Sequence, residues 1–134
     1  MQDLLMVNLI AENTEKLDSD IKWQYKEKSG QYTAKVAKNE EVIKLKIGRA
    51  MLRVGSLIFL KLSTKDEGIV CIIEPQKGVF NKYDSEDEKK LAEAMKRLLG
   101  LASRQNSQRE LRDSENEQAR RQAIFRKIIA IKQS

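Results

Sequence analysis

The stretch DIKWQYKEKSGQYTAKV, residues 20–36, decides the fold, because its apolar and aromatic residues alternate with polar ones. A repeat of two residues is typical of a β-strand with one covered face and one face in water. Ser29 and Gly30 interrupt the alternation with a turn signal, after which the pattern resumes, so the stretch predicts a β-hairpin. Its covered face would carry Ile21, Trp23, Tyr25, Tyr32, Ala34 and Val36, and its other face Lys22, Gln24, Lys26, Thr33 and Lys35.

A helix is predicted ahead of the hairpin. Residues 3–17 place apolar side chains at spacings of three and four, which is the pattern of an amphipathic helix. The sequence DSD at residues 18–20 would end it. The covered side would consist of Leu4, Val7, Ile10, Ala11 and Leu17.

Three more strands are predicted after the hairpin. Residues 43–47 alternate between apolar side chains and lysine, while SLIFLKLS (56–63) and GIVCIIE (68–74) flank the polar turn TKDEG. Because GIVCIIE is apolar on both faces, we expect it at the centre of the sheet. Residues 48–55 show no clear pattern.

Two helices are predicted at the C-terminal end, each behind a capping box, in which Ser at the helix start is followed three residues later by Glu. The first would end at Gly100 or within SRQNSQ (103–108), and the second would span about residues 115–132. The capping boxes are Ser85 with Glu88 and Ser114 with Glu117.

The predicted fold class is therefore α+β: an N-terminal helix, an antiparallel sheet of about five strands, and two C-terminal helices. Residues 1–103 would form the α+β domain. Residues 104–134 would form a charged linker and a C-terminal amphipathic helix.

The composition indicates a soluble, globular chain with a heavily charged surface. Of its 134 residues, 40% are hydrophobic and 34% charged, and no run approaches the roughly 20 apolar residues that span a bilayer. The opening residues lack the basic region and cleavage site of a secretory signal. Cys71 is the only cysteine, which indicates a reducing compartment. We expect a cytoplasmic protein without a transmembrane segment.

The net charge of +6 is unevenly distributed. Residues 1–20 carry one basic and five acidic side chains, whereas residues 21–49 carry eight basic and three acidic ones. Residues 104–134 again carry eight basic and four acidic side chains, and most of these basic residues are arginine. Two separate basic zones favour a polyanionic partner, although surface lysine also serves solubility.

The residue types for most catalytic chemistry are missing. The chain has no histidine, which excludes His-based acid–base catalysis, the usual Ser-His and Cys-His pairs, and most transition-metal sites. Cys71 lies in an apolar run and fits a small core residue. Asp18 and Asp20 fit a helix end better than a metal site, and no glycine-rich phosphate loop is present. We expect no enzyme activity, no cofactor and no metal.

A second acidic cluster fits a structural role as well. It stands at the start of a predicted helix, where negative charge stabilises the helix dipole. Its members are Asp84, Glu86, Asp87 and Glu88.

The lysine-rich face of the predicted sheet has two interpretations. It is a solvated face that discourages aggregation, or it is a surface that holds phosphates without discriminating between sequences. Sheets that stack bases expose their aromatic residues, but here Trp23, Tyr25 and Tyr32 would lie on the covered face, which argues against stacking. The lysines opposite are Lys22, Lys26, Lys28, Lys35, Lys44 and Lys46.

The C-terminal region poses a similar choice. Its apolar stripe must be buried, and three coverings are considered: the domain itself, a partner helix such as a second copy, or an anionic membrane surface. The single Phe and the absence of Trp in this region make a membrane surface the weakest of the three. Interleaved charges suit either phosphate binding or pairing within the helix. They are Arg104, Arg109, Glu110, Arg112, Asp113, Glu115, Glu117, Arg120, Arg121 and Arg126.

The segment from the first helix to Val36 resembles small uncharacterised bacterial α+β proteins, in which a helix leads to an I-x-W strand and then to a turn with Y-x-A. The matching residues are Ile21, Trp23, Tyr32 and Ala34. The resemblance implies an α+β fold around an amphipathic hairpin, and it implies no activity.

The sequence therefore favours a non-enzymatic binding or regulatory module that acts through protein–protein contact, with self-association through the C-terminal helix as one form of that contact. The alternative is a nucleic-acid-binding protein with a lysine-rich sheet face and an arginine-rich tail. The partner-binding residues would be Ile124, Phe125, Ile128 and Ile129. For nucleic acid they would be Lys22, Lys26, Lys35, Lys44, Lys46, Arg120 and Arg121.

Overall fold

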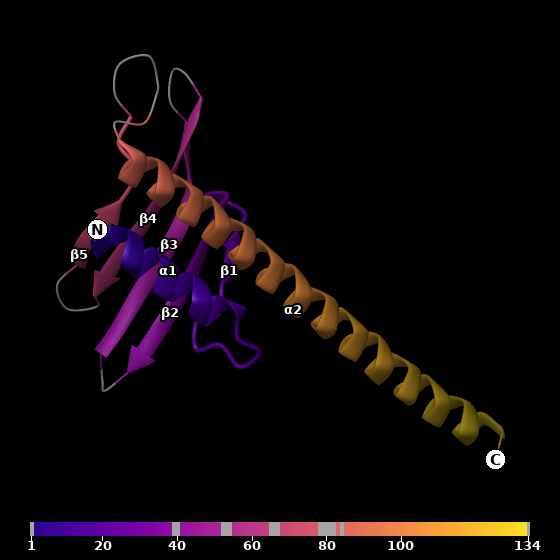
Figure 1. The fold of residues 1–134 in the computed structure, drawn as a ribbon. Helices are drawn as coiled ribbons and strands as arrows, with labels where there is room; N and C mark the ends of the chain where they lie inside the picture. The colour runs from indigo at the N-terminus through magenta and orange to yellow at the C-terminus, as the bar shows by residue number, and fades with distance from the viewer. Residues whose placement is uncertain are drawn as a thin grey trace.

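The structure, a computed structural model, describes residues 2–38, 41–51, 55–64, 68–77, 83 and 85–133. One helix precedes a five-stranded sheet and a second, much longer helix follows it, so the α+β prediction is confirmed (Figure 1). The elements are α1 (Gln2–Glu15), β1 (Gln24–Lys26), β2 (Gln31–Lys38), β3 (Glu41–Met51), β4 (Ser56–Thr64), β5 (Gly68–Ile73) and α2 (Glu86–Gln133).

The sheet is a simple antiparallel meander, in which the strands lie side by side in chain order. The predicted turn at Gly30 is confirmed: Gly30 adopts a φ of 66°, and its N–H donates to the carbonyl of Lys26 at 2.8 Å. The register pairs Tyr32 with Ile47 and Leu45 with Leu62, so apolar side chains gather on one face.

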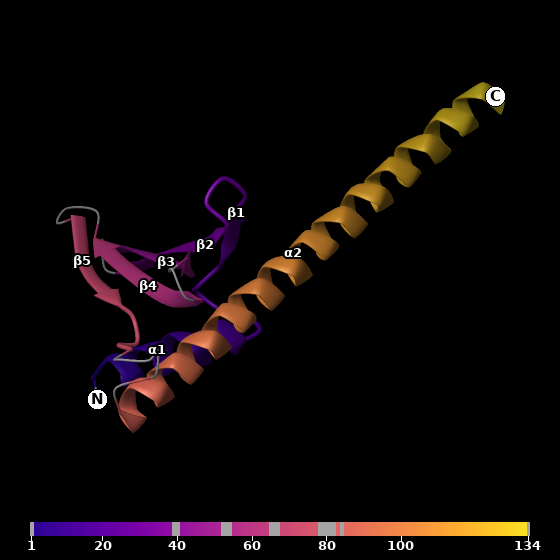
Figure 2. The same ribbon diagram turned by 90° about the horizontal axis from the view of Figure 1, so that it is seen from above.

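Both helices lie on that apolar face of the sheet (Figure 2). The lysines of β2, β3 and β4 alternate with the apolar residues and therefore lie on the opposite face. Trp23 is fully buried beneath them, and its indole N–H donates to the Thr14 hydroxyl of α1 at 3.1 Å. An ion pair of 2.7 Å between Arg97 and Glu15 joins the two helices at their exposed side. The core contains Val7, Ala11, Ile21, Trp23, Ala34, Leu45, Ile47, Leu60, Ile73, Leu91, Ala94, Met95, Leu98 and Ala102.

The prediction of two C-terminal helices is wrong, because α2 continues from Glu86 to Gln133. Its start was predicted correctly: the N–H of Glu88 donates to the Ser85 hydroxyl at 3.2 Å. The supposed second capping box does not form. Glu117 pairs instead with Arg121, one turn along the same helix, at 2.8 Å. Among the helices that the structure describes, none has the length and apolar character needed to cross a membrane.

Two predicted strands differ in position or extent. GIVCIIE forms β5 at the edge of the sheet rather than its centre, because a meander in chain order leaves its last strand with one neighbour. Ile72 pairs with Lys61 on the face that the helices do not cover, and it is 55% exposed. The first strand begins only at Gln24, since Ile21 and Trp23 bond to α2 instead of to a strand. Of residues 48–55, those up to Met51 extend β3, and 52–54 lie outside the described residues.

Leu17 was expected on the covered side of the first helix, and this is also wrong. The helix ends at Glu15, so Leu17 belongs to a turn and is 99% exposed. Leu4 and Ile10 are half-buried against the core, and Val7 and Ala11 are fully inside it, as the spacing predicted.

Candidate interaction surfaces

The last half of α2 projects away from the domain as a single helix (Figures 1 and 2). We call residues 110–133 the arm. Every residue from Glu110 to Lys132 is exposed, so among the described residues nothing covers this part of the helix. Packing of the apolar stripe on the domain, one of the three coverings considered from the sequence, does not occur.

The end of the arm carries the predicted partner-binding residues. Phe125 is 63% exposed, Ile124 and Ile128 are each 58% exposed, and Ile129 is 38% exposed. Exposed apolar side chains gathered on one element mark interaction sites in soluble proteins. The structure thus brings these four residues together on one free helix end, with Ile131 beside them.

Charge divides the arm into two halves. Residues 110–117 contain four acidic side chains and one arginine, and residues 118–133 contain five basic side chains and no acidic one. Arg120 and Arg121, both predicted to bind nucleic acid, lie in the basic half and are exposed. The arm is therefore acidic near the domain and basic at its apolar end.

At the root of the arm, Gln105 bonds to the segment that leads into β1. Its Oε1 accepts the N–H of Trp23 at 2.7 Å, and its Nε2 donates to the carbonyl of Ile21 at 2.7 Å. One amide side chain thus takes the place of a neighbouring strand. This contact explains why Ile21 and Trp23 are buried without belonging to the sheet.

Asn106 and Arg109 continue this contact along α2. Asn106 Oδ1 accepts the N–H of Tyr25 at 3.2 Å, and Arg109 Nη2 donates to Asn106 Oδ1 at 3.2 Å and to the carbonyl of Trp23. We call Gln105, Asn106 and Arg109 the clasp. From the sequence, this polar stretch was predicted to be a helix end or a linker, whereas it lies inside α2.

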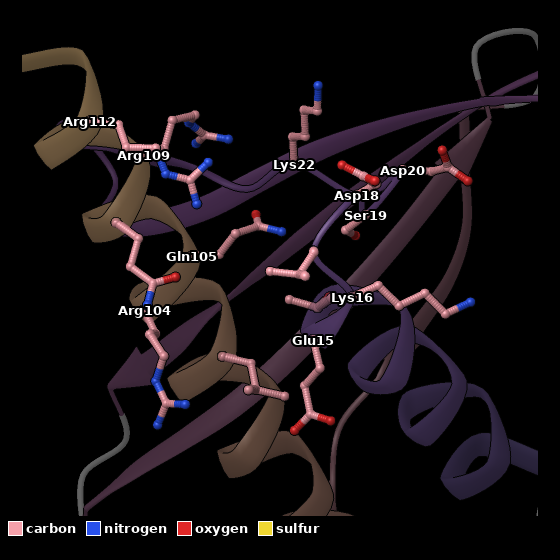
Figure 3. Close-up of a pocket in the computed structure, with 14 residues that line it drawn as sticks. Glu15, Lys16, Asp18, Ser19, Asp20, Lys22, Arg104, Gln105, Arg109 and Arg112 are labelled. Carbon is pink, nitrogen blue, oxygen red and sulfur yellow. The ribbon is translucent and has the colours of Figure 1, made fainter. Parts of the chain in front are cut away.

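Beside the clasp is a cavity of about 820 Å³ between the end of α1, residues 16–22 and the middle of α2. Figure 3 shows the arginines of α2 on one wall, and three carboxylates together with Lys16 on the wall opposite. Within the described residues, no group of three or more His, Cys, Asp or Glu side chains is placed to hold a metal ion. The acidic wall has Glu15, Asp18 and Asp20, and the basic wall has Arg104, Arg109 and Arg112, with Lys22 above.

The opposite side of the sheet carries four lysines in register. Lys35 of β2 is the direct partner of Lys44 in β3, and Lys46 of β3 is the direct partner of Lys61 in β4. Like charges that face each other across strands destabilise a sheet. We call Lys35, Lys44, Lys46 and Lys61 the lysine quartet.

All four lysines line one hollow of about 350 Å³. The hydroxyl side chains of Thr33 and Ser63 stand at its wall, and no carboxylate is among the described residues that line it. Within those residues none of the four lysines forms a salt bridge. The hollow therefore carries a concentrated positive charge, and no carboxylate among its described lining residues neutralises it.

Two of the predicted nucleic-acid-binding lysines lie apart from the quartet. Lys22 lines the cavity beside the clasp, and Lys26 pairs with Gln31 at the edge of the sheet. Lys61, which the sequence analysis left out, replaces them. Its place opposite Lys46 depends on the β3–β4 register, and the alternation of one strand does not reveal that register.

Trp23 and Tyr32 lie on the covered face as predicted, whereas Tyr25 was expected to be covered and is exposed. Trp23 is fully buried, and Tyr25, though 44% exposed, packs its ring against Tyr32 with centroids 5.1 Å apart on the helix side. Phe59 is the direct partner of Gly48 and so lies on the lysine side, half-buried. Trp23 is thus not accessible to a stacking base.

Comparison of the chain with protein-family models, curated proteins and solved structures finds no match. The resemblance to small bacterial α+β proteins stays a prediction.

The acidic residues Glu86, Asp87 and Glu88 form the first turn of α2, and Asp84 lies outside the described residues.

Proposed function

We propose that the protein is a non-enzymatic binding module that acts through protein–protein contact, and that its arm assembles with the arm of a second copy. The observation that carries this proposal is the exposed apolar end of the arm, where Phe125 is 63% exposed. Most helical stability in proteins comes from packing an apolar face against another element. A helix that projects without cover gains such packing from a partner.

The charge pattern of the arm supports a second copy as the partner. In an antiparallel pair, residues 110–117 of one arm lie along residues 120–127 of the other, so each acidic half meets a basic half. In a parallel pair, acidic would meet acidic and basic would meet basic, which costs free energy. An antiparallel pair is also an isologous two-fold interface, the commonest kind in soluble oligomers.

The same alignment gives the apolar end a place to pack. It brings Ile128 of one arm beside Arg109 and Leu111 at the root of the other, and Leu111 is 61% exposed. The adjoining cavity offers further surface, because Leu17 is 99% exposed there and Asp18 and Asp20 stand beside it.

Light scattering after size exclusion tests the assembly. We expect the full chain to have twice the 15.4 kDa mass of one chain, and deletion of residues 115–134 to give a monomer. The double variant Phe125→Ser with Ile128→Ser should be monomeric as well, since it removes two exposed apolar side chains from the arm.

A matched control replaces two exposed apolar residues elsewhere. Leu5→Ser with Leu9→Ser changes side chains that are 60% and 56% exposed on α1, and this variant should keep the mass of the wild type. A full chain that remains monomeric at high micromolar concentration would contradict the proposal. So would an unchanged mass after deletion of the arm.

A further inference from the structure

We propose that the lysine quartet is a sequence-independent binding site for the phosphate backbone of nucleic acid. The proposal does not depend on assembly through the arm, since the quartet lies on the opposite side of the sheet from both helices. In the free protein, two pairs of like charges face each other across neighbouring strands, and their repulsion lowers the stability of the sheet. A negatively charged ligand removes that repulsion when it binds.

The arrangement suits a chain of phosphates better than one phosphate. Neighbouring strands are about 4.8 Å apart, and alternate residues on one strand are about 6.6 Å apart. From Lys35 through Lys44 and Lys46 to Lys61, the quartet crosses three strands in a zigzag that is roughly 10 Å or more from end to end. Four ammonium groups spread over that length meet successive phosphates of a polymer.

The surroundings favour recognition of phosphate rather than bases. Thr33 and Ser63 add hydroxyl donors at the wall of the hollow. Stacking platforms use several exposed aromatic side chains, whereas the only aromatic residue that the described strands place on this side is Phe59, which is half-buried. We therefore expect single-stranded oligonucleotides of different base composition to bind with similar affinity.

Fluorescence anisotropy with labelled single- and double-stranded oligonucleotides, across a salt series, tests the site. The full-length variant Lys44→Gln with Lys46→Gln should bind about tenfold more weakly at roughly 0.1 M salt. Its salt slope, the change of log affinity with log salt, should fall by about two, one for each lysine removed. Because glutamine keeps most of the side-chain length and removes like charge, the variant should melt no lower than the wild type.

Two variants with the same change in net charge locate the site. Lys89→Gln with Lys90→Gln alters exposed residues in the first turns of α2 and should bind like the wild type. Arg120→Gln with Arg121→Gln tests the arm and should likewise keep the affinity. Equal losses in the quartet variant and in either of these variants would overturn the proposal.

Two further outcomes would also overturn it. The first is a wild-type chain that binds no oligonucleotide even at low salt. The second is binding of inorganic polyphosphate by a chain that binds neither oligonucleotide, which would assign the quartet to a different phosphate polymer.

Discussion

Gln105 shows how one side chain organises the join between α2 and the sheet. It satisfies the N–H of Trp23 and the carbonyl of Ile21, each at 2.7 Å, in a part of the chain where no strand is available. A backbone group that loses its partner when buried costs about 1–3 kcal/mol. The geometry of the segment 21–23 thus depends on a residue more than 80 positions later.

We predict that Gln105→Leu lowers the free energy of unfolding by about 2–3 kcal/mol, because it leaves both backbone groups unpaired. Urea denaturation followed by Trp23 emission measures this, since Trp23 is fully buried and is the only tryptophan. The matched control is Gln108→Leu, an exposed residue of the same cavity, which should change the value by less than about 0.5 kcal/mol. Equal effects of the two substitutions would contradict the role assigned to Gln105.

For Ile21 and Trp23, the sequence predicted burial correctly and secondary structure incorrectly. Alternation placed Ile21 and Trp23 inside, and they are 6% and 0% exposed. It also implied that they belong to a strand, because the pattern of one segment reports which side is covered and not which partner satisfies its backbone. That partner is a distant glutamine, and no local pattern points to it.

Among the elements, α2 differs most from its prediction. Ser114 and Glu117 match a capping box, but the same spacing also fits the interior of a helix, where Glu117 pairs with Arg121. Gly100 is tolerated in a helix at a cost of about 1 kcal/mol, and no proline follows it to enforce an end. The clasp adds tertiary contacts in the middle of this stretch, which keeps the helix continuous.

The direction of arm pairing is testable with spin labels in a Cys71→Ser background. In an antiparallel pair, labels introduced by Ala119→Cys lie near the two-fold axis. The two helix axes are about 8–10 Å apart there, so the labels are close together. Labels introduced by Glu110→Cys are offset along the helices by about 25 Å, because residue 110 of one arm lies opposite residue 127 of the other. Short distances at both positions, measured by pulsed electron resonance, would indicate a parallel pair and contradict the charge argument.

At the scale of the whole molecule, the class of the fold and the division of its faces were predictable, and the arrangement of elements was not. Alternation and one continuous apolar run marked five strands, and the helical spacing in α1 marked Val7 and Ala11 as core. The apolar character of GIVCIIE pointed to the centre of the sheet, yet β5 is the edge strand. Strand order depends on the connections between elements, and a single strand does not record them.

The two candidate sites also differ in how far the sequence predicts them. The apolar end of the arm is visible in the sequence, because Ile124, Phe125 and Ile128 are neighbours along one helix. The lysine quartet is only partly visible, because it depends on the registers of three strands. Local spacing therefore predicts surfaces made by one element, and it fails for surfaces made by several.

Assembly and folding of the arm are linked if the proposed pairing is correct, and this gives a prediction for the whole molecule. An arm without a partner is marginal as a helix, so dilution of the assembled protein should melt it. With α1 of 14 residues and α2 of 48, of which the arm is the last half, the far-ultraviolet circular dichroism of the full chain should lose roughly two fifths of its helical signal. The emission of Trp23 should stay constant over the same dilution, because the domain core does not involve the arm.

The deletion of residues 115–134 provides the control for this experiment. Its helical signal should depend little on concentration, since most of the segment that melts is gone. A full chain whose helical signal is the same at every concentration, while its mass changes with dilution, would show that the arm is a stable helix by itself. In that case pairing would join two preformed surfaces, and the free energy of assembly would come from the apolar and charged contacts alone, with no contribution lost to ordering the helix.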